Sequence, residues 1–284
     1  MEYNADGWRV KQPKHQVIHP DPVGKEPRGW FPATKFFDQL SFIGDKLVGC
    51  LVLETSEGLI QFDCLCPTDY SIEILEEGYK ELGLDINDLK AVIITHAHGD
   101  HYGKADYLRE KYGAKIYMSK IDYDFINAPT SRHKLGFEIY DFLGDGDVFT
   151  LGDTSVYCYL TPGHSPGGLS FIFPVTDEGR PHMACMWGGT GAPRELDVCQ
   201  TYLDSVDYFE AECQKYHVDV EVAAHPECDN GVERYALCRC IVNGVANPFV
   251  IGENAIHKYL DNLRDMVNEQ IDDIKSGKVE RRHI

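Results

Sequence analysis

One short segment constrains this chain more than any other feature: Thr95-His96-Ala97-His98-Gly99-Asp100-His101, directly after a short apolar strand. Three imidazoles and a carboxylate at a strand end are hard to explain by packing alone. In an extended segment, residues two apart point the same way, so His96 and His98 can hold one ion. The chain then turns into a helix, where Asp100 and His101 point elsewhere and can hold a second ion. Imidazole and carboxylate groups are typical zinc ligands, so the segment predicts a zinc centre.

Two further histidines have a similar placement along the chain. His164 stands in Thr161-Pro162-Gly163-His164-Ser165-Pro166-Gly167-Gly168, after an expected strand at 156–160, and His225 follows an expected strand at 218–223. Loops at strand ends are where such folds carry their functional residues. Four side chains cannot complete two metal sites. We therefore expect His164 and His225 to supply the ligands that the first segment lacks.

Hairpins and helices alternate in both halves of the chain, with no linker between the halves. Apolar alternation predicts a hairpin over 48–62, and a helix over 69–82 is expected to begin at Asp69 or Ser71 and end at Gly83. Further strands are expected at 89–94, 114–118, 148–151, 156–160, 169–173, 183–187 and 218–223, and further helices at 102–112, 121–126, 202–216 and 256–274. This order predicts two sheets packed together with helices outside.

The ends of the chain differ from its middle. Residues 1–35 are rich in Pro, Gly, Lys and His without a clear period, which predicts an N-terminal arm on the surface. Residues 36–277 are expected to form a single domain. The polar, basic stretch 278–284 is expected to be a frayed C-terminal tail.

The motifs together resemble the metallo-β-lactamase superfamily. The pattern His-x-His-x-Asp-His, then Gly-His-Ser-Pro-Gly-Gly, then a late histidine after a strand runs through the chain from about Phe37 to Ile274. The arrangement is most similar to the third, His-rich, di-zinc subclass of metallo-β-lactamases. The resemblance implies the α/β fold of that family, an αββα four-layer sandwich. It also implies two Zn²⁺ ions per chain, one held by His96, His98 and His164 and the other by Asp100, His101 and His225.

The activity implied by this resemblance is metal-dependent hydrolysis. A hydroxide that bridges the two zinc ions would open a cyclic amide or ester, β-lactamase-like, with weak β-lactamase activity included. Asp100 is the expected catalytic residue, because its free oxygen can orient the attacking hydroxide. The main alternative is a cytosolic lactonase or thioesterase that acts on a small metabolite. A di-iron redox protein and a non-catalytic scaffold are less favoured, and the intact ligand set argues against the scaffold.

The segment Gly188-Gly189-Thr190-Gly191 departs from the patterns of the superfamily in two ways. Most of its hydrolases carry a metal-bridging aspartate here, so in this chain solvent alone would bridge the metals, as in the lactamase subclass. Those lactamases tend to offer serines here that bind the β-lactam carboxylate. Glycines at Gly189 and Gly191 remove that anchor. Thr190, Arg132 and His133 are the candidate substrate-binding residues that would replace it.

The charge balance restricts the partners. The chain has 27 basic and 46 acidic residues, a formal net charge of −19, and such a surface repels nucleic acid and anionic lipid. No stretch approaches the roughly 20 apolar residues that a membrane span needs. We expect a small-molecule substrate, no nucleic acid or membrane partner, and an oligomeric state that the sequence does not define. The start of the chain lacks the features of a signal peptide and its ten cysteines are irregularly spaced, so we expect a cytoplasmic protein with reduced thiols.

Overall fold

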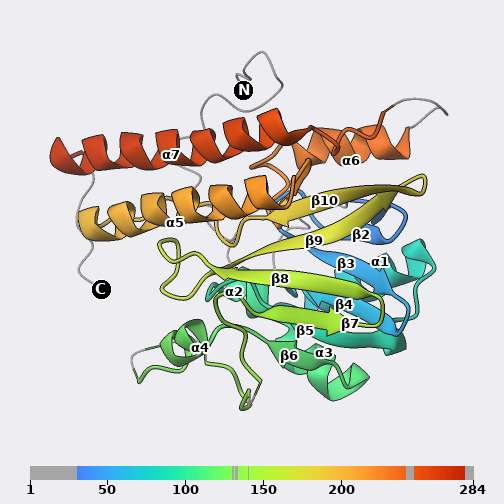
Figure 1. Cartoon of the computed structure of the whole chain (residues 1–284). Helices are drawn as coiled ribbons and strands as arrows, with labels where there is room; N and C mark the ends of the chain where they lie inside the picture. The colour runs from blue at the N-terminus through green and yellow to red at the C-terminus, as the bar shows by residue number, and fades with distance from the viewer. Residues whose placement is uncertain (1–30, 130, 132–133, 140, 241–245, 279–284) are drawn as a thin grey trace.

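The computed structural model describes residues 31–129, 131, 134–139, 141–240 and 246–278. These residues form two β-sheets that pack face to face, with helices on both outer faces (Figure 1). The predicted αββα four-layer sandwich is confirmed. Arg132, His133 and most of the expected arm and tail lie outside the described residues.

The first sheet comes from the N-terminal half of the chain. It has six strands in sequence order, β1 (Thr34–Lys35), β2 (Leu40–Gly44), β3 (Gly49–Thr55), β4 (Gly58–Phe62), β5 (Leu89–Ile93) and β6 (Lys115–Tyr117). The first four strands pair antiparallel, whereas β4, β5 and β6 run parallel. Parallel strands need a crossover, and helix α1 (Asp69–Leu82) supplies the one between β4 and β5. Their carboxyl ends therefore meet at one edge of the sheet.

The second sheet comes from the C-terminal half. Its order is β11 (Val220–Val222), β10 (Arg180–Met186), β9 (Leu169–Asp177), β8 (Thr154–Leu160) and β7 (Val148–Leu151). The strands pair antiparallel except β10 and β11, which are parallel and joined through helix α5 (Leu196–Lys215). Strand β9 is buried along its first five residues, as expected for a strand between two layers.

Three apolar clusters separate the four layers. The central cluster fills the space between the sheets and contains stacked aromatic rings, for example Phe62 on Phe173 at 5.0 Å. A second cluster packs α1 and α3 (Ala105–Tyr112) on the outer face of the first sheet. A third packs α5 and α7 (Glu253–Lys275) on the outer face of the second sheet, where Figure 1 shows them side by side. The apolar stripe predicted for the last helix faces this cluster.

Several element boundaries differ from the expected ones. Helix α1 is capped by the Thr68 hydroxyl rather than by Asp69 or Ser71, and it ends at Gly83, which adopts the left-handed conformation at φ 70°. The single helix expected at 102–112 is two helices, α2 (Gly99–Tyr102) and α3, because Gly103 lies against the chain at 65–67. Helix α4 (Lys120–Ile126) is present as expected. The sequence did not predict the short helices η1 (Ile86–Asp88) and α6 (Gly231–Arg239).

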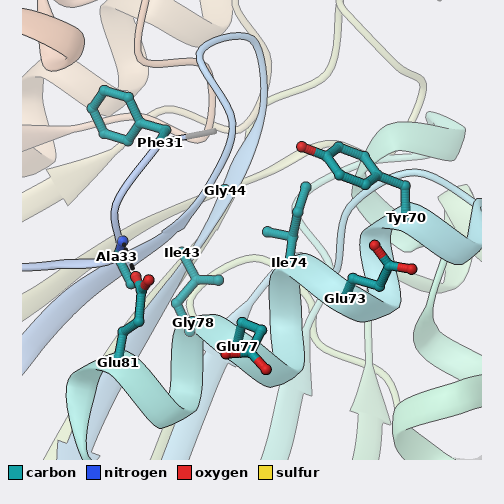
Figure 2. A pocket seen from close by; sticks show the side chains of 10 residues that line it. All are labelled: Phe31, Ala33, Ile43, Gly44, Tyr70, Glu73, Ile74, Glu77, Gly78 and Glu81. Atoms are coloured by element: carbon teal, nitrogen blue, oxygen red, sulfur yellow. Dashed lines mark hydrogen bonds between the residues drawn. The ribbon is translucent and has the colours of Figure 1, made fainter. Parts of the chain in front are cut away.

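The end of the expected surface arm belongs to the fold. Phe31 is 7% exposed and packs edge-on against Phe42 and Tyr235, and β1 pairs with β2. An aromatic side chain that buries this much apolar surface packs into the core even when the residues beside it in the sequence are polar. Phe31 also lines a groove of about 170 Å³ along α1, together with Ile74 and a row of glutamates (Figure 2). Among the described residues, no helix is long and apolar enough to cross a membrane.

Candidate metal centre

Three loops meet at one edge of the sandwich, and each follows the carboxyl end of a strand. The segment 95–101 follows β5, the loop 161–168 follows β8, and 223–226 follows β11. The ligand atoms of their histidines and of Asp100 gather in two groups, and the atoms of each group lie within 4.8 Å of one another. The structure therefore brings together all six side chains that the sequence named as metal ligands.

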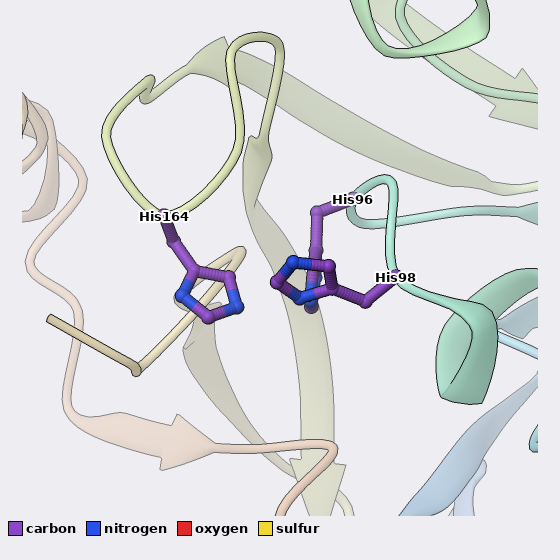
Figure 3. A group of neighbouring side chains, drawn as sticks. All are labelled: His96, His98 and His164. Carbon is purple, nitrogen blue, oxygen red and sulfur yellow. The ribbon is translucent and has the colours of Figure 1, made fainter. Parts of the chain in front are cut away.

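The first triad consists of His96, His98 and His164. His96 and His98 lie on the loop after β5, and His164 approaches them from the loop of the other sheet (Figure 3). The His96 Nε2 atom is 3.1 Å from the His98 Nδ1 atom. His96 is 1% exposed, whereas His98 is exposed, so the triad is open on the His98 side.

The second triad consists of Asp100, His101 and His225. The two histidine Nε2 atoms are 3.0 Å apart, and each lies 3.8 Å from the Asp100 Oδ2 atom. Ligands about 2.1 Å from a tetrahedral zinc ion are separated by about 3.4 Å. The triangle of donor atoms therefore has the size that a single zinc ion requires.

Hydrogen bonds at the far ring nitrogens define the tautomers of the second triad. His101 Nδ1 donates to the Asp63 carboxylate at 2.7 Å, and His225 Nδ1 donates to the Leu47 carbonyl at 2.6 Å. Both partners only accept, so in the neutral imidazoles the proton is on Nδ1. The two Nε2 lone pairs then face each other across 3.0 Å. A cation between them converts this repulsion into coordination, so the residues fit a metal ion.

The first triad has the same arrangement with different partners. His164 Nδ1 donates to the Gly191 carbonyl at 2.7 Å. His96 Nδ1 lies 2.9 Å from the Thr95 hydroxyl, which itself donates to Asp63 at 2.9 Å and so accepts from the imidazole. Such partners orient the ring and raise its affinity for metal.

The protonation states suit metal binding near neutral pH. Burial and the neighbouring imidazoles hold the pKa of His96 well below its usual value, and desolvation lowers the pKa of His164 to about 3. Burial alone would raise the pKa of Asp100, but the adjacent His101 and His225 outweigh it and lower the value to about 2. Burial likewise acts to lower the pKa of His101, but Asp63 and Asp100 outweigh it and raise the value. The three imidazoles of the first triad are thus neutral near pH 7, whereas the Asp100 carboxyl of the second triad is ionised.

Two buried carboxylates support the loops, and the sequence reasoning missed both. Asp63 follows β4 and accepts from the Thr95 amide at 2.8 Å as well as from His101. Its place at a strand end beside β5 is the signal that could have found it. Asp122 lies on α4 and accepts hydrogen bonds from two of the three loops.

The loop that holds His225 is supported from behind by a buried ion cluster. Arg234 on α6 lies 3.2 Å from Glu221 on β11 and 3.9 Å from Asp229. Glu221 and Asp229 are at most 1% exposed, and burial raises the pKa of Asp229 to about 6 and that of Glu221 well above its usual value. The cluster joins both ends of the segment that contains His225.

The glycine-rich segment after β10 lies against His164. A β-carbon at Gly189 would lie 2.4 Å from the His164 ring, and one at Gly191 would lie 2.8 Å from it. Glycine is therefore required by the first triad, a reason that the sequence alone did not reveal. Thr190 between them is 8% exposed, and its hydroxyl lies 3.4 Å from the Cys228 sulfur. Its role as a substrate-binding residue stays a prediction, as do those of Arg132 and His133 outside the described residues.

Comparison with known proteins matches about half of the chain to a family and most of it to a known fold. Residues 43–177 match the family model described as the metallo-beta-lactamase superfamily. The subclass B3 metallo-beta-lactamase BJP-1 of Bradyrhizobium japonicum has a similar structure. Its TM-score is 0.74 at 23% identity, over 88% of this chain and 97% of that one.

Curated relatives match a shorter stretch. The probable polyketide biosynthesis zinc-dependent hydrolase PksB of Bacillus subtilis is 36% identical over 86 residues, which is 30% of this chain and 35% of that protein. The hydroxyacylglutathione hydrolase GloC of Haemophilus influenzae is 34% identical over 98 residues, 31% of this chain and 46% of that protein. The chain thus spans between a third and a half of the length of these relatives.

Proposed function

We propose that the chain is a zinc-dependent hydrolase of the metallo-β-lactamase superfamily that opens a cyclic amide or ester of a small molecule. The observation that carries the proposal is the convergence of two triads in which the outer ring nitrogens of His96, His101, His164 and His225 are hydrogen-bonded to acceptors. Buried imidazoles arranged in this way are costly without a cation. Two zinc ions per chain and a cytoplasmic location are parts of this proposal.

The residues of the two triads would have different roles in such a reaction. When bound, zinc lowers the pKa of a water molecule toward about 7 and polarises the carbonyl under attack. His96, His98 and His164 would hold one ion, and Asp100, His101 and His225 the other. Asp100 has a second carboxylate oxygen, which can accept a proton from the attacking water and orient it. No charged residue from the segment 188–191 enters the site, so solvent would be the sole link between the ions.

A lactonase or thioesterase is the second candidate, and specific observations favour it. The matched relatives include a probable polyketide biosynthesis hydrolase and a hydroxyacylglutathione hydrolase. The segment 188–191 also lacks the serines that would hold a β-lactam carboxylate. Each lost hydrogen bond to a charged group weakens binding by about 1.5–3 kcal/mol. We therefore expect β-lactam hydrolysis to be weak, with a high KM.

The test combines metal analysis with a substrate panel. We expect about two zinc ions per purified chain and loss of hydrolysis on chelation. Rates on a penicillin, a cephalosporin, a carbapenem, a lactone and an acyl thioester then separate the two candidates. Efficient turnover of a β-lactam would contradict the expected weak activity and leave the zinc assignment intact. A chain that binds no zinc would refute the hydrolase itself.

A further inference from the structure

A buried carboxylate outside both triads joins the loops of the first one. Asp122, in the first turn of α4, is 1% exposed. Its Oδ2 atom accepts from the Ala97 amide at 2.9 Å and from the Ser165 hydroxyl at 2.6 Å, and its Oδ1 atom accepts from the Gly167 amide at 2.7 Å. Both of its oxygens therefore accept hydrogen bonds from the two loops.

These contacts lie next to every ligand of the first triad. Ala97 stands between His96 and His98, so a hydrogen bond at its amide sets the backbone that directs both imidazoles. Ser165 directly follows His164. The first triad therefore depends on two chain segments about 65 residues apart in sequence, and one side chain binds both.

The fit between helix and loop is close. A β-carbon at Gly167 would lie 2.4 Å from the Ser119 hydroxyl and 2.7 Å from the Asp122 amide. The Ser119 hydroxyl also accepts from the Asp122 amide at 3.1 Å, which caps the helix and holds Asp122 in place. The carboxylate is thus anchored on a helix and is not a mobile surface group.

The surroundings of Asp122 associate this carboxylate with the first triad and not with the second. None of the ion pairs among the described residues involves Asp122, and burial raises the pKa of its carboxyl while its three hydrogen bonds oppose that change. Its contacts are the two loops of the first triad, whose three ligands are neutral. The second triad has a separate support, because Asp63 holds His101 directly.

We propose that Asp122 is the positioning residue of the first metal site, joining the His96–His98 loop to the His164 loop so that three neutral imidazoles converge on one ion. This inference rests on the proposed function, because it concerns how that zinc site is assembled. It assigns Asp122 to the first site alone and leaves the second to Asp63.

The test replaces Asp122 with asparagine and measures each site separately. Asparagine keeps the volume, but in either orientation its NH₂ group faces a backbone N–H. Zinc titrations of the full chain use a His225→Ala background, which retains only the first triad, and a His164→Ala background, which retains only the second. Asp124→Asn, an exposed carboxylate on the same helix paired with Lys120, is the matched control.

We expect Asp122→Asn to weaken zinc binding at the first site about 10- to 100-fold and to change the second site less than about threefold. Asp124→Asn should change neither. Equal losses at both sites, with a matching fall in the Tm of the metal-free chain, would show a general structural role and overturn the proposal, as would unchanged first-site affinity. If Asp122→Asn does not fold, Ser165→Ala removes one bond and should still weaken the first site selectively. Its failure to do so overturns the proposal.

The wild-type titration separates this inference from the proposed function. Two bound zinc ions together with an unaffected Asp122→Asn chain would overturn the positioning role alone. A wild-type chain that binds no zinc would overturn both.

Discussion

The two triads share the segment 95–101 but take their third residue from different loops, and they differ in charge and support. The first has three neutral imidazoles and takes its orientation from a hydroxyl, a carbonyl and the Asp122 junction. The second contains the Asp100 carboxylate, and the Asp63 carboxylate lies directly behind His101. A metal ion in the neutral site keeps more of its positive charge and polarises a carbonyl more strongly. We therefore expect a division of labour, in which an ion in the first site would act as the electrophile and an ion in the second would hold the nucleophile.

Asp100→Ala should give the largest effect and tests this division directly. The change removes a ligand of the second triad and the oxygen that orients the attacking water. We expect hydrolysis to fall roughly 10³-fold or more, because metal-ion stabilisation contributes several kcal/mol. Metal analysis should show one zinc ion per chain. The exposed Asp106→Ala serves as control, and full turnover with one zinc ion would show that the first site works alone.

Arg234→Met tests the support that only the second triad has. It leaves Glu221 and Asp229 buried without their cation, so we expect the free energy of unfolding to fall by about 3–5 kcal/mol at pH 8. Burial already raises the pKa of both carboxyls, so folding takes up protons and stability falls as pH rises through the raised values. The loss of unfolding free energy caused by Arg234→Met should therefore be smaller at pH 5 than at pH 8. Denaturant unfolding at both pH values measures it, and an equal loss at each pH would exclude this explanation.

Asp63→Asn tests the carboxylate that directly supports His101 in the second triad. Asparagine can present its carbonyl or its NH₂ group to His101, but it cannot satisfy three donors as the carboxylate does. We expect zinc affinity at the second site to fall about 10- to 100-fold, with a smaller loss at the first site through Thr95. Zinc titration of single-site backgrounds measures both. A larger loss at the first site would reverse the assignment of supports.

Gly189→Ser is expected to have the smallest effect, and it tests the lactamase comparison. Serine restores a hydroxyl of the kind the lactamases offer, but its β-carbon would lie 2.4 Å from the His164 ring. We expect His164 to shift and first-site zinc affinity to fall by about tenfold, without a gain in β-lactam turnover. Gly136→Ser is the control, because Gly136 is exposed and a β-carbon there would meet open space. Improved β-lactam turnover would show that the His164 loop can move to accommodate a serine at position 189.

The gathering of the six candidate ligands was predictable because their sequence signals are local. His96, His98, Asp100 and His101 stand in one segment, and His164 and His225 each follow a strand. The layered fold followed from the alternation of hairpins and helices together with the family resemblance.

The supports of the site were not predictable because their contacts are long-range. Asp63 lies 38 residues from His101, and the carbonyl that holds His225 belongs to Leu47, 178 residues away. Nothing in the sequence near Leu47 distinguishes that turn from an ordinary hairpin. The role of Gly189 was not predictable either. The sequence suggested only that a substrate anchor is absent, whereas the structure shows that the His164 ring leaves no room for a side chain there.

The split of each triad between the two halves of the chain has a consequence for biosynthesis. A chain growing from its N-terminus contains His96 and His98 before His164, and His225 follows 61 residues after His164. At about 5–20 residues per second, that interval lasts about 3–12 s. The residues of the two proposed zinc sites are thus synthesised in order, with the neutral triad complete in sequence before the last residue of the carboxylate triad. We therefore expect ribosome-bound chains that end before His225 to bind at most one metal ion.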